Sequence, residues 1–234
     1  MAAVFRLVVT SMLRFIPLAL LLAAGPLLAQ PRPGLKPGLS GRVEDKTYIA
    51  PGGSFRVTIP VLPELGGTII DTPNVVTFQD RFNLHVSIAA FPLDATQRWE
   101  LSTRGLKDYL SYFFETFVMA DFHNLFPDAR TESARFEPEI MNGALLAYTL
   151  LPGGSMFSDK RTLLGADDKP AVAKRGNLVF VRRGTIYIIS TELAERVIER
   201  SSYRKTTAEE DEILRLRLAD ILKKMEFARP ATDS

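Results

Sequence analysis

The sequence contains no cysteine, only two histidines and a single tryptophan. The lack of cysteine excludes disulfide bonds, thiolate nucleophiles, thiol redox chemistry and cysteine-ligated zinc sites. A Ser-His-Asp mechanism would have to use one of the two histidines, His85 or His123. At 234 residues, the chain is long enough to bury a core without disulfides.

The sequence also lacks the spacing of a phosphate-binding loop or of a nucleophile elbow. The letters PGGS occur twice, at residues 51–54 and 152–155, but the first copy enters a predicted strand and the second leaves one. A phosphate loop would lead into a helix, whose free N–H groups face the anion. Proline followed by glycine suits a type II turn, because glycine tolerates a positive φ. Both copies are therefore predicted to be turns.

The N-terminus resembles a secretory leader. Arg6 and Arg14 precede an apolar run that leads through small residues to Ala29. Residues 1–29 are therefore predicted to be a signal peptide, with translation starting at Met1 or Met12, and the protein to be exported to the periplasm or secreted. The alternative is an uncleaved anchor helix, although the apolar run is shorter than the roughly 20 residues of a membrane span. Membrane contact is expected only in that case.

Charge argues against a nucleic-acid partner. The leader holds two of the 29 basic residues and no acidic residue, so 27 basic and 27 acidic residues remain after cleavage. Nucleic-acid binding depends on clustered lysine and arginine. The basic pairs Lys160-Arg161, Lys174-Arg175 and Arg182-Arg183 are separated along the chain and are predicted to be scattered surface charge.

The rest of the chain divides into a Pro/Gly-rich tether (residues 30–46), one domain (47–228) and a short tail (229–234). In the strand FNLHVSIAAF, apolar residues alternate with Asn83, His85 and Ser87. This polar strand face is either a groove for a small ligand or the solvated side of a sheet. The sequence favours the solvated face.

Two helical segments stand out by their apolar period. The first is predicted to be a helix capped by Ser102 or Thr103. Its apolar stripe consists of Leu106, Leu110, Phe113, Phe114 and Phe117. A second stripe on it, formed by Val118, Phe122 and Leu125, is a candidate partner face or a second buried side. The closing helix is predicted to start with a capping box of Thr207 and Glu210.

The segments NLVFVRR, which starts at Asn177, and TIYIIST are predicted to be strands joined in a hairpin through Arg183-Gly184. The order of strands, one long helix, strands and a closing helix predicts an α+β fold, with a mainly antiparallel sheet and helices packed on its faces. Asp159, Asp167 and Asp168 share one loop but lack the spacing of a calcium loop. No metal site, cofactor or catalytic residue is predicted.

Five segments carry a resemblance to a known family: GGSFRVTIP, FNLHVSIAAFPL, GALLAYTLLPGG, NLVFVRRGTIYIIS and ILKKMEF. Their order resembles the PsbP-like family, the extrinsic photosystem subunit superfamily with its non-photosynthetic bacterial relatives. The resemblance covers roughly residues 47–228 and implies an α/β/α sandwich and a non-catalytic accessory or assembly role. It supplies no site residues.

The sequence thus predicts an exported, non-catalytic accessory, binding or assembly protein with a protein partner. Two alternatives from other classes remain open. One is a hydrolase that uses His85 with a nearby serine, and the other is a small-ligand carrier that uses the face of Asn83, His85 and Ser87.

Overall fold

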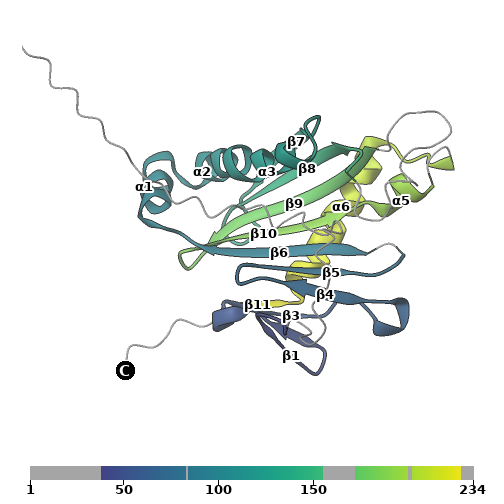
Figure 1. Cartoon of the computed structure of the whole chain (residues 1–234). Coiled ribbons are helices and arrows are strands. Elements are labelled where there is room, and N and C mark those ends of the chain that lie inside the picture. Colours follow the sequence, from purple (N-terminus) through teal and green to yellow (C-terminus); the bar gives the residue numbers. More distant parts are fainter. Residues whose placement is uncertain (1–37, 83, 155–171, 200–201, 228–234) are drawn as a thin grey trace, which may run out of the picture.

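The computed structural model describes residues 38–82, 84–154, 172–199 and 202–227. In this part of the chain, antiparallel sheets and helices stack in layers (Figure 1). The predicted α+β class, with an antiparallel sheet and helices on its faces, is confirmed. The predicted leader (1–29), the tail (229–234) and the loop with the three aspartates lie outside the described residues.

The larger sheet of the described chain has seven strands in the order β4-β5-β6-β10-β9-β8-β7, and every neighbouring pair is antiparallel. Its strands are β4 (Thr68–Asp71), β5 (Val75–Gln79), β6 (His85–Pro92), β7 (Arg130–Glu137), β8 (Ala144–Pro152), β9 (Val172–Arg182) and β10 (Thr185–Glu192). The hairpin predicted at Arg183-Gly184 is confirmed. Its two turn residues have φ values of 50° and 69°, as a type I′ turn requires.

Helices cover one face of this sheet. They are α1 (Ala95–Arg104), α2 (Leu106–Phe113), a π-helical turn (Phe114–Val118) and α3 (Met119–Leu125). The short helix α5 (Ala194–Ile198) contacts both sides, since Val197 packs in the core of this face and Arg196 pairs with Glu210 of α6. The opposite face carries α6 (Thr207–Lys223) and a smaller sheet of β1 (Arg42–Glu44), β2 (Thr47–Ile49), β3 (Phe55–Thr58) and β11 (Met225–Phe227). No helix formed by the described residues is long and apolar enough to cross a membrane.

Each face of the larger sheet has its own core, because side chains alternate along a strand. On β9, Val179 packs with the helices α2 and α3, whereas its neighbour Leu178 packs with α6. On β10, Ile188 and Ile189 divide in the same way. A central strand buried on both faces is therefore apolar at consecutive positions, as NLVFV in β9 shows.

The first helical region begins earlier than predicted. Asp94 caps α1, and its carboxylate accepts a hydrogen bond from the backbone N–H of Gln97 at 2.7 Å. Ser102 and Thr103 therefore lie inside α1 and cap nothing. The chain breaks at Gly105, whose φ of 77° and ψ of 162° end one helix and begin the next. The sequence pattern did not predict α1, because this helix has no buried residue and therefore no apolar stripe.

The capping box of α6 lies one residue before its predicted place. Thr206 is the N-cap, and it exchanges hydrogen bonds with Glu209. The predicted partner Glu210 instead turns inward and is buried. Thr-Thr and Glu-Glu both occur in this segment, so the sequence fits either register, and the burial of Glu210 decides between them.

Both PGGS motifs are confirmed as turns. In the first, the N–H of Gly53 donates to the carbonyl of Ala50 at 2.9 Å, and Gly52 has φ 68° and ψ 1°. In the second, the N–H of Gly154 donates to the carbonyl of Leu151 at 3.1 Å. The glycine after proline again has a positive φ, 71°. These are the features of type II turns.

Part of the predicted tether belongs to the folded domain. β1 lies within residues 30–46 and pairs with β2. The backbone N–H groups of Ser40 and Gly41 donate to the Asp71 carboxylate at 2.9 and 2.7 Å, and the hydroxyl of Tyr48 donates to it at 2.7 Å. The N-terminal segment is thereby attached to the edge of the larger sheet.

Candidate functional site

The predicted ligand-binding face is not solvated where the structure describes it. His85 and Ser87 lie on β6 and are only 1% and 0% exposed, facing the helix-covered side of the sheet. Asn83 lies outside the described residues. The favoured reading of this face as solvated is therefore wrong for His85 and Ser87, because β6 is a central strand that is buried on both faces. Ligand binding by this face stays a prediction.

His85 and Ser87 belong to a larger set of polar side chains, in cross-strand register on one face of the sheet, which we call the polar belt. Its members are Thr77, Gln79, His85, Ser87, Thr149, Arg175, Asn177, Ser190 and Glu192. Thr77 and Gln79, on β5, are half-buried, and the other seven are buried. The polar belt therefore runs from the partly exposed strand β5 to the centre of the sheet.

Hydrogen bonds link the polar belt from strand to strand. The Ser190 hydroxyl donates to Asn177 Oδ1 at 2.7 Å, and Asn177 Nδ2 donates to Thr149 Oγ1 at 3.2 Å. The hydroxyls of Thr77 and Ser87 lie 3.3 Å apart. Both serine hydroxyls thus engage neighbouring side chains. A buried polar group needs such a partner, since burial without one costs about 1–3 kcal/mol.

Arg175 is the charged centre of the polar belt. Its guanidinium Nη2 lies 2.8 Å from His85 Nδ1, and its Nε lies 3.6 Å from a carboxylate oxygen of Glu192. Burial, opposed by the charge of Glu192, lowers the pKa of Arg175. Burial and the charge of Arg175 hold the pKa of His85 well below its ordinary value. His85 is therefore neutral near pH 7, and its Nδ1 can accept from the guanidinium.

The donors of Arg175 are not all used. Nε is ion-paired with Glu192, whereas Nη1 is buried and forms no hydrogen bond in the part of the chain that the structure describes. An unpaired buried donor is costly, so an oxygen acceptor beside Nη1 would be stabilised. The polar belt can therefore offer a hydrogen-bond donor to a small molecule or to water.

Helix α3 covers the inner end of the polar belt and accounts for the predicted partner face. The Phe122 ring lies 6.0 Å from the guanidinium carbon of Arg175, and Met119 contacts Thr149. Val118 and Phe122 are buried in the core, whereas Leu125 is 50% exposed. Val118 and Phe122 therefore cannot contact a partner in this conformation. Their stripe is the second buried side of the helix.

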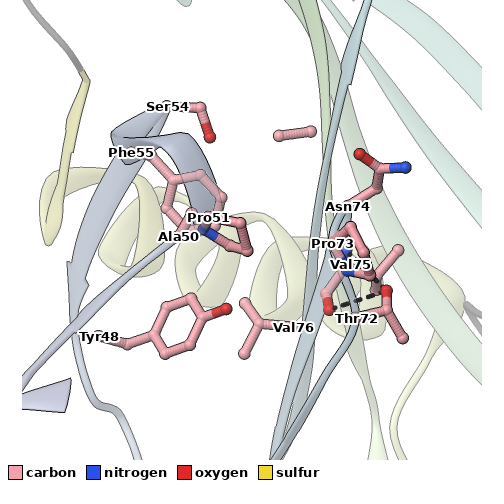
Figure 2. Close-up of a pocket in the computed structure, with 11 residues that line it drawn as sticks. Tyr48, Ala50, Pro51, Ser54, Phe55, Thr72, Pro73, Asn74, Val75 and Val76 are labelled. Atoms are coloured by element: carbon pink, nitrogen blue, oxygen red, sulfur yellow. Dashed lines mark hydrogen bonds between the residues drawn. The ribbon is translucent and has the colours of Figure 1, made fainter. Parts of the chain in front are cut away.

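A shallow hollow of about 10 Å³ lies beside the first PGGS turn (Figure 2). Pro51 and Ser54 line it on one side, and Pro73 and Asn74 line it on the other. Ligand pockets usually measure about 300–1,000 Å³, so this hollow is too small to enclose a typical ligand.

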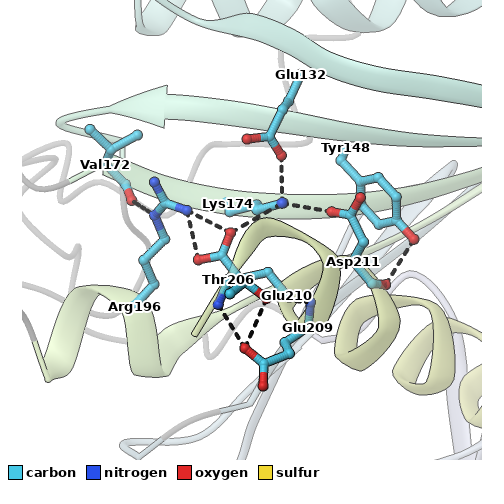
Figure 3. A network of polar contacts seen from close by, with 9 residues as sticks. All are labelled: Glu132, Tyr148, Val172, Lys174, Arg196, Thr206, Glu209, Glu210 and Asp211. Carbon is cyan, nitrogen blue, oxygen red and sulfur yellow. Dashed lines mark hydrogen bonds and ion pairs between the residues drawn. The ribbon is translucent and has the colours of Figure 1, made fainter. Parts of the chain in front are cut away.

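A second buried charge cluster lies on the opposite face of the sheet (Figure 3). Lys174 Nζ lies 2.5 Å from Glu132, 2.6 Å from Asp211 and 3.1 Å from Glu210. Arg196 lies 2.7 Å from Glu210, so three carboxylates meet two cations. Burial lowers the pKa of Lys174, but its hydrogen bonds with the three carboxylates outweigh this effect, and the pKa is raised. The cluster joins β9, β7, α6 and α5.

The interpretation of Lys174-Arg175 as surface charge is wrong, since both side chains are fully buried. They are neighbours on β9, so strand alternation sends Lys174 toward α6 and Arg175 toward α3. Little in the sequence pattern indicated this burial, because the predicted strand starts at Asn177 while β9 starts at Val172. Within the described residues, no group of three or more histidine or acidic side chains suits a metal ion.

Exposed apolar side chains gather at the turns beside β4. Leu62 and Phe82 are each 57% exposed and Leu65 is 41% exposed. The N–H of Arg81 donates to the carbonyl of Leu65 at 3.4 Å, so the two turns adjoin. Asp80 fixes the second turn by accepting from the N–H of Phe82 at 2.8 Å. We call Leu62, Leu65 and Phe82 the turn surface.

Solved structures with a similar fold include the following two. Cyanobacterial PsbP (CyanoP) from Synechocystis sp. PCC 6803 has a TM-score of 0.48 and 14% identity, over 83% of this chain and 97% of that chain. The Ran-binding protein Mog1p of Saccharomyces cerevisiae has a TM-score of 0.46 and 9% identity, over 81% of this chain and 96% of that one. No protein-family model and no curated protein matches the sequence.

The structural neighbours thus include a PsbP, the family that the sequence resembles. With identities of 14% and 9% and TM-scores below 0.5, these likenesses say nothing about function. What the chain shares with these proteins is an arrangement of strands and helices.

Proposed function

We propose that this protein is an exported, non-catalytic accessory or assembly protein that acts by binding another protein. The observation that carries the proposal is the turn surface. Leu62, Leu65 and Phe82 are large apolar side chains held in water on hydrogen-bonded turns. Clusters of exposed apolar residues are typical of interaction sites, whereas isolated ones are ordinary. Because its turns are already fixed, the turn surface would lose little conformational entropy on binding.

The test is crosslinking in the native cell envelope, followed by mass spectrometry of the crosslinked partner. The variant Leu62→Ser/Leu65→Ser/Phe82→Ser is expected to lose the partner without losing its fold, as judged by circular dichroism. Leu216→Ser is the matched control, because Leu216 is 54% exposed but lies on α6. Equal crosslinking of the triple variant and the unaltered protein contradicts the proposal, as does the recovery of the protein without any partner.

A second candidate function, a small-ligand carrier, is favoured by the unused Nη1 donor of Arg175 in the polar belt. Native mass spectrometry of the purified protein is expected to show a bound small molecule. The complex should weaken in His85→Ala, because the loss of Nδ1 releases the guanidinium that it holds. A mass equal to that of the polypeptide alone would rule this candidate out.

A further inference from the structure

The two edges of the larger sheet differ in how they resist pairing with another strand. β7 forms one edge and carries four charged side chains: Arg130, Glu132, Arg135 and Glu137. It also has an irregularity between Thr131 and Ser133, where the register shifts. Charged side chains and bulges are the usual protection of an edge strand against a second chain. The edge at β7 is therefore protected against pairing with a strand of another chain.

In the described residues, the other edge, β4, has neither a row of charged side chains nor a register shift, and the N-terminal segment binds it at its last residue, through the side chain of Asp71. Its sequence is TIID, and its single charge, Asp71, is engaged with Ser40, Gly41 and Tyr48. In the described residues, the backbone of β4 forms hydrogen bonds with β5 alone. Ile70 is 44% exposed on the same side of the sheet as the polar belt. β4 thus presents unused backbone donors and acceptors beside an exposed apolar side chain.

We propose that β4 pairs antiparallel with β4 of a second copy of this chain, with Ile70 opposite Ile70 of that copy. A two-fold axis perpendicular to the sheet makes an antiparallel pair from two identical edges and keeps each face on its own side. Such an interface is self-complementary, so the edge strand of one copy meets the same strand in the other. This inference goes beyond the proposed function and does not rest on it.

Charge favours a second copy as the occupant of this edge. The whole chain carries a net charge of +2, and the chain without residues 1–29 has 27 basic and 27 acidic residues. Two copies therefore approach each other without strong repulsion, and proteins with a net charge near zero associate readily. The pairing would also bring the two exposed Ile70 side chains together, where cross-strand β-branched pairs are favourable.

The absence of cysteine makes a direct test possible. Cα atoms of directly opposed residues in an antiparallel pair lie about 4.5–5.5 Å apart, within the range that a disulfide accepts. The Ile70→Cys variant is expressed from the full-length sequence and purified in the form that the cell accumulates. It is expected to form a covalent dimer on mild oxidation. The matched control is Ala134→Cys, an exposed position on β7, which should remain monomeric.

The second measurement is the dissociation constant of the dimer of the unaltered protein, determined by sedimentation equilibrium. A concentration-dependent dimer is expected, and Ile70→Lys should raise its dissociation constant at least about tenfold, because it places like charges opposite each other. Ala134→Lys should leave the constant unchanged. A protein that stays monomeric at high concentration overturns the proposal. So does a dimer that Ile70→Lys leaves intact, or equal disulfide crosslinking of the Ile70→Cys and Ala134→Cys variants.

Discussion

The buried cluster around Lys174 allows a sharp prediction about stability. Lys174→Met keeps much of the side-chain volume but removes the cation that Glu132, Glu210 and Asp211 share at 2.5–3.1 Å. Of the ion pairs that the described residues form with these three carboxylates, the one between Glu210 and Arg196 would remain. Breaking a buried ion pair typically costs about 3–5 kcal/mol, because an uncompensated buried charge remains.

The expected cost lies at the lower end of that range. The side chains of Glu132 and Asp211 are 22% and 27% exposed, so water screens part of the repulsion. We therefore expect the free energy of unfolding to fall by about 3 kcal/mol, which corresponds to a melting temperature lower by on the order of 10 °C. Adding Glu132→Gln to Lys174→Met should restore part of this loss, because it removes one of the repelling charges.

Urea denaturation of the unaltered protein and the variants measures this loss. Lys224→Met is the control, because Lys224 lies 2.6 Å from Asp220 in an exposed pair on α6. Exposed pairs contribute about 0–1 kcal/mol, so this variant should lose little stability. If Lys174→Met loses no more stability than Lys224→Met, or if Glu132→Gln adds to the damage, the reasoning about the cluster is refuted.

Three further predictions concern single residues. His85 has a lowered pKa, so the folded state resists its protonation. The contribution of His85 to the free energy of unfolding is therefore complete above about pH 6.5, the ordinary pKa of histidine. Below that pH, the contribution falls by up to about 1.4 kcal/mol per pH unit. Urea titrations at pH 7.5 and 5.5 should therefore show a weaker loss in His85→Gln than in the unaltered protein, and parallel losses would contradict this. Thr206→Ala should lower the free energy of unfolding by about 1 kcal/mol, because it removes the cap of α6, whereas Thr207→Ala should lower it clearly less. If thermal melts show that Thr207→Ala is the more destabilising variant, Thr207 is the cap, as the sequence predicted. Gly41→Ala should cost about 1–3 kcal/mol, because its methyl group would lie 2.5 Å from a backbone oxygen, while Gly38→Ala meets nothing within 4 Å; equal melting temperatures would contradict the close approach.

The sequence alone determined the features that depend on local chemistry. The two PGGS turns and the Arg183-Gly184 hairpin follow from residues that are pre-set for those backbone angles, and each formed as predicted. Of the predicted apolar stripe, Leu110, Phe113 and Phe114 are buried, and Leu106 and Phe117 are half-buried against the same core. The order of strands and helices was sufficient to predict an antiparallel sheet with helices on its faces.

The tertiary structure decided where the polar residues lie. Alternation showed that His85 and Ser87 share a face, but the burial of that face depends on which strands become central in the sheet. Lys174 and its partners Glu132 and Glu210 lie on β9, β7 and α6, far apart in the sequence. The cap register of α6 was ambiguous until Glu210 was placed beside Lys174. Such choices rest on contacts between distant segments, and those contacts leave no periodic pattern in the sequence.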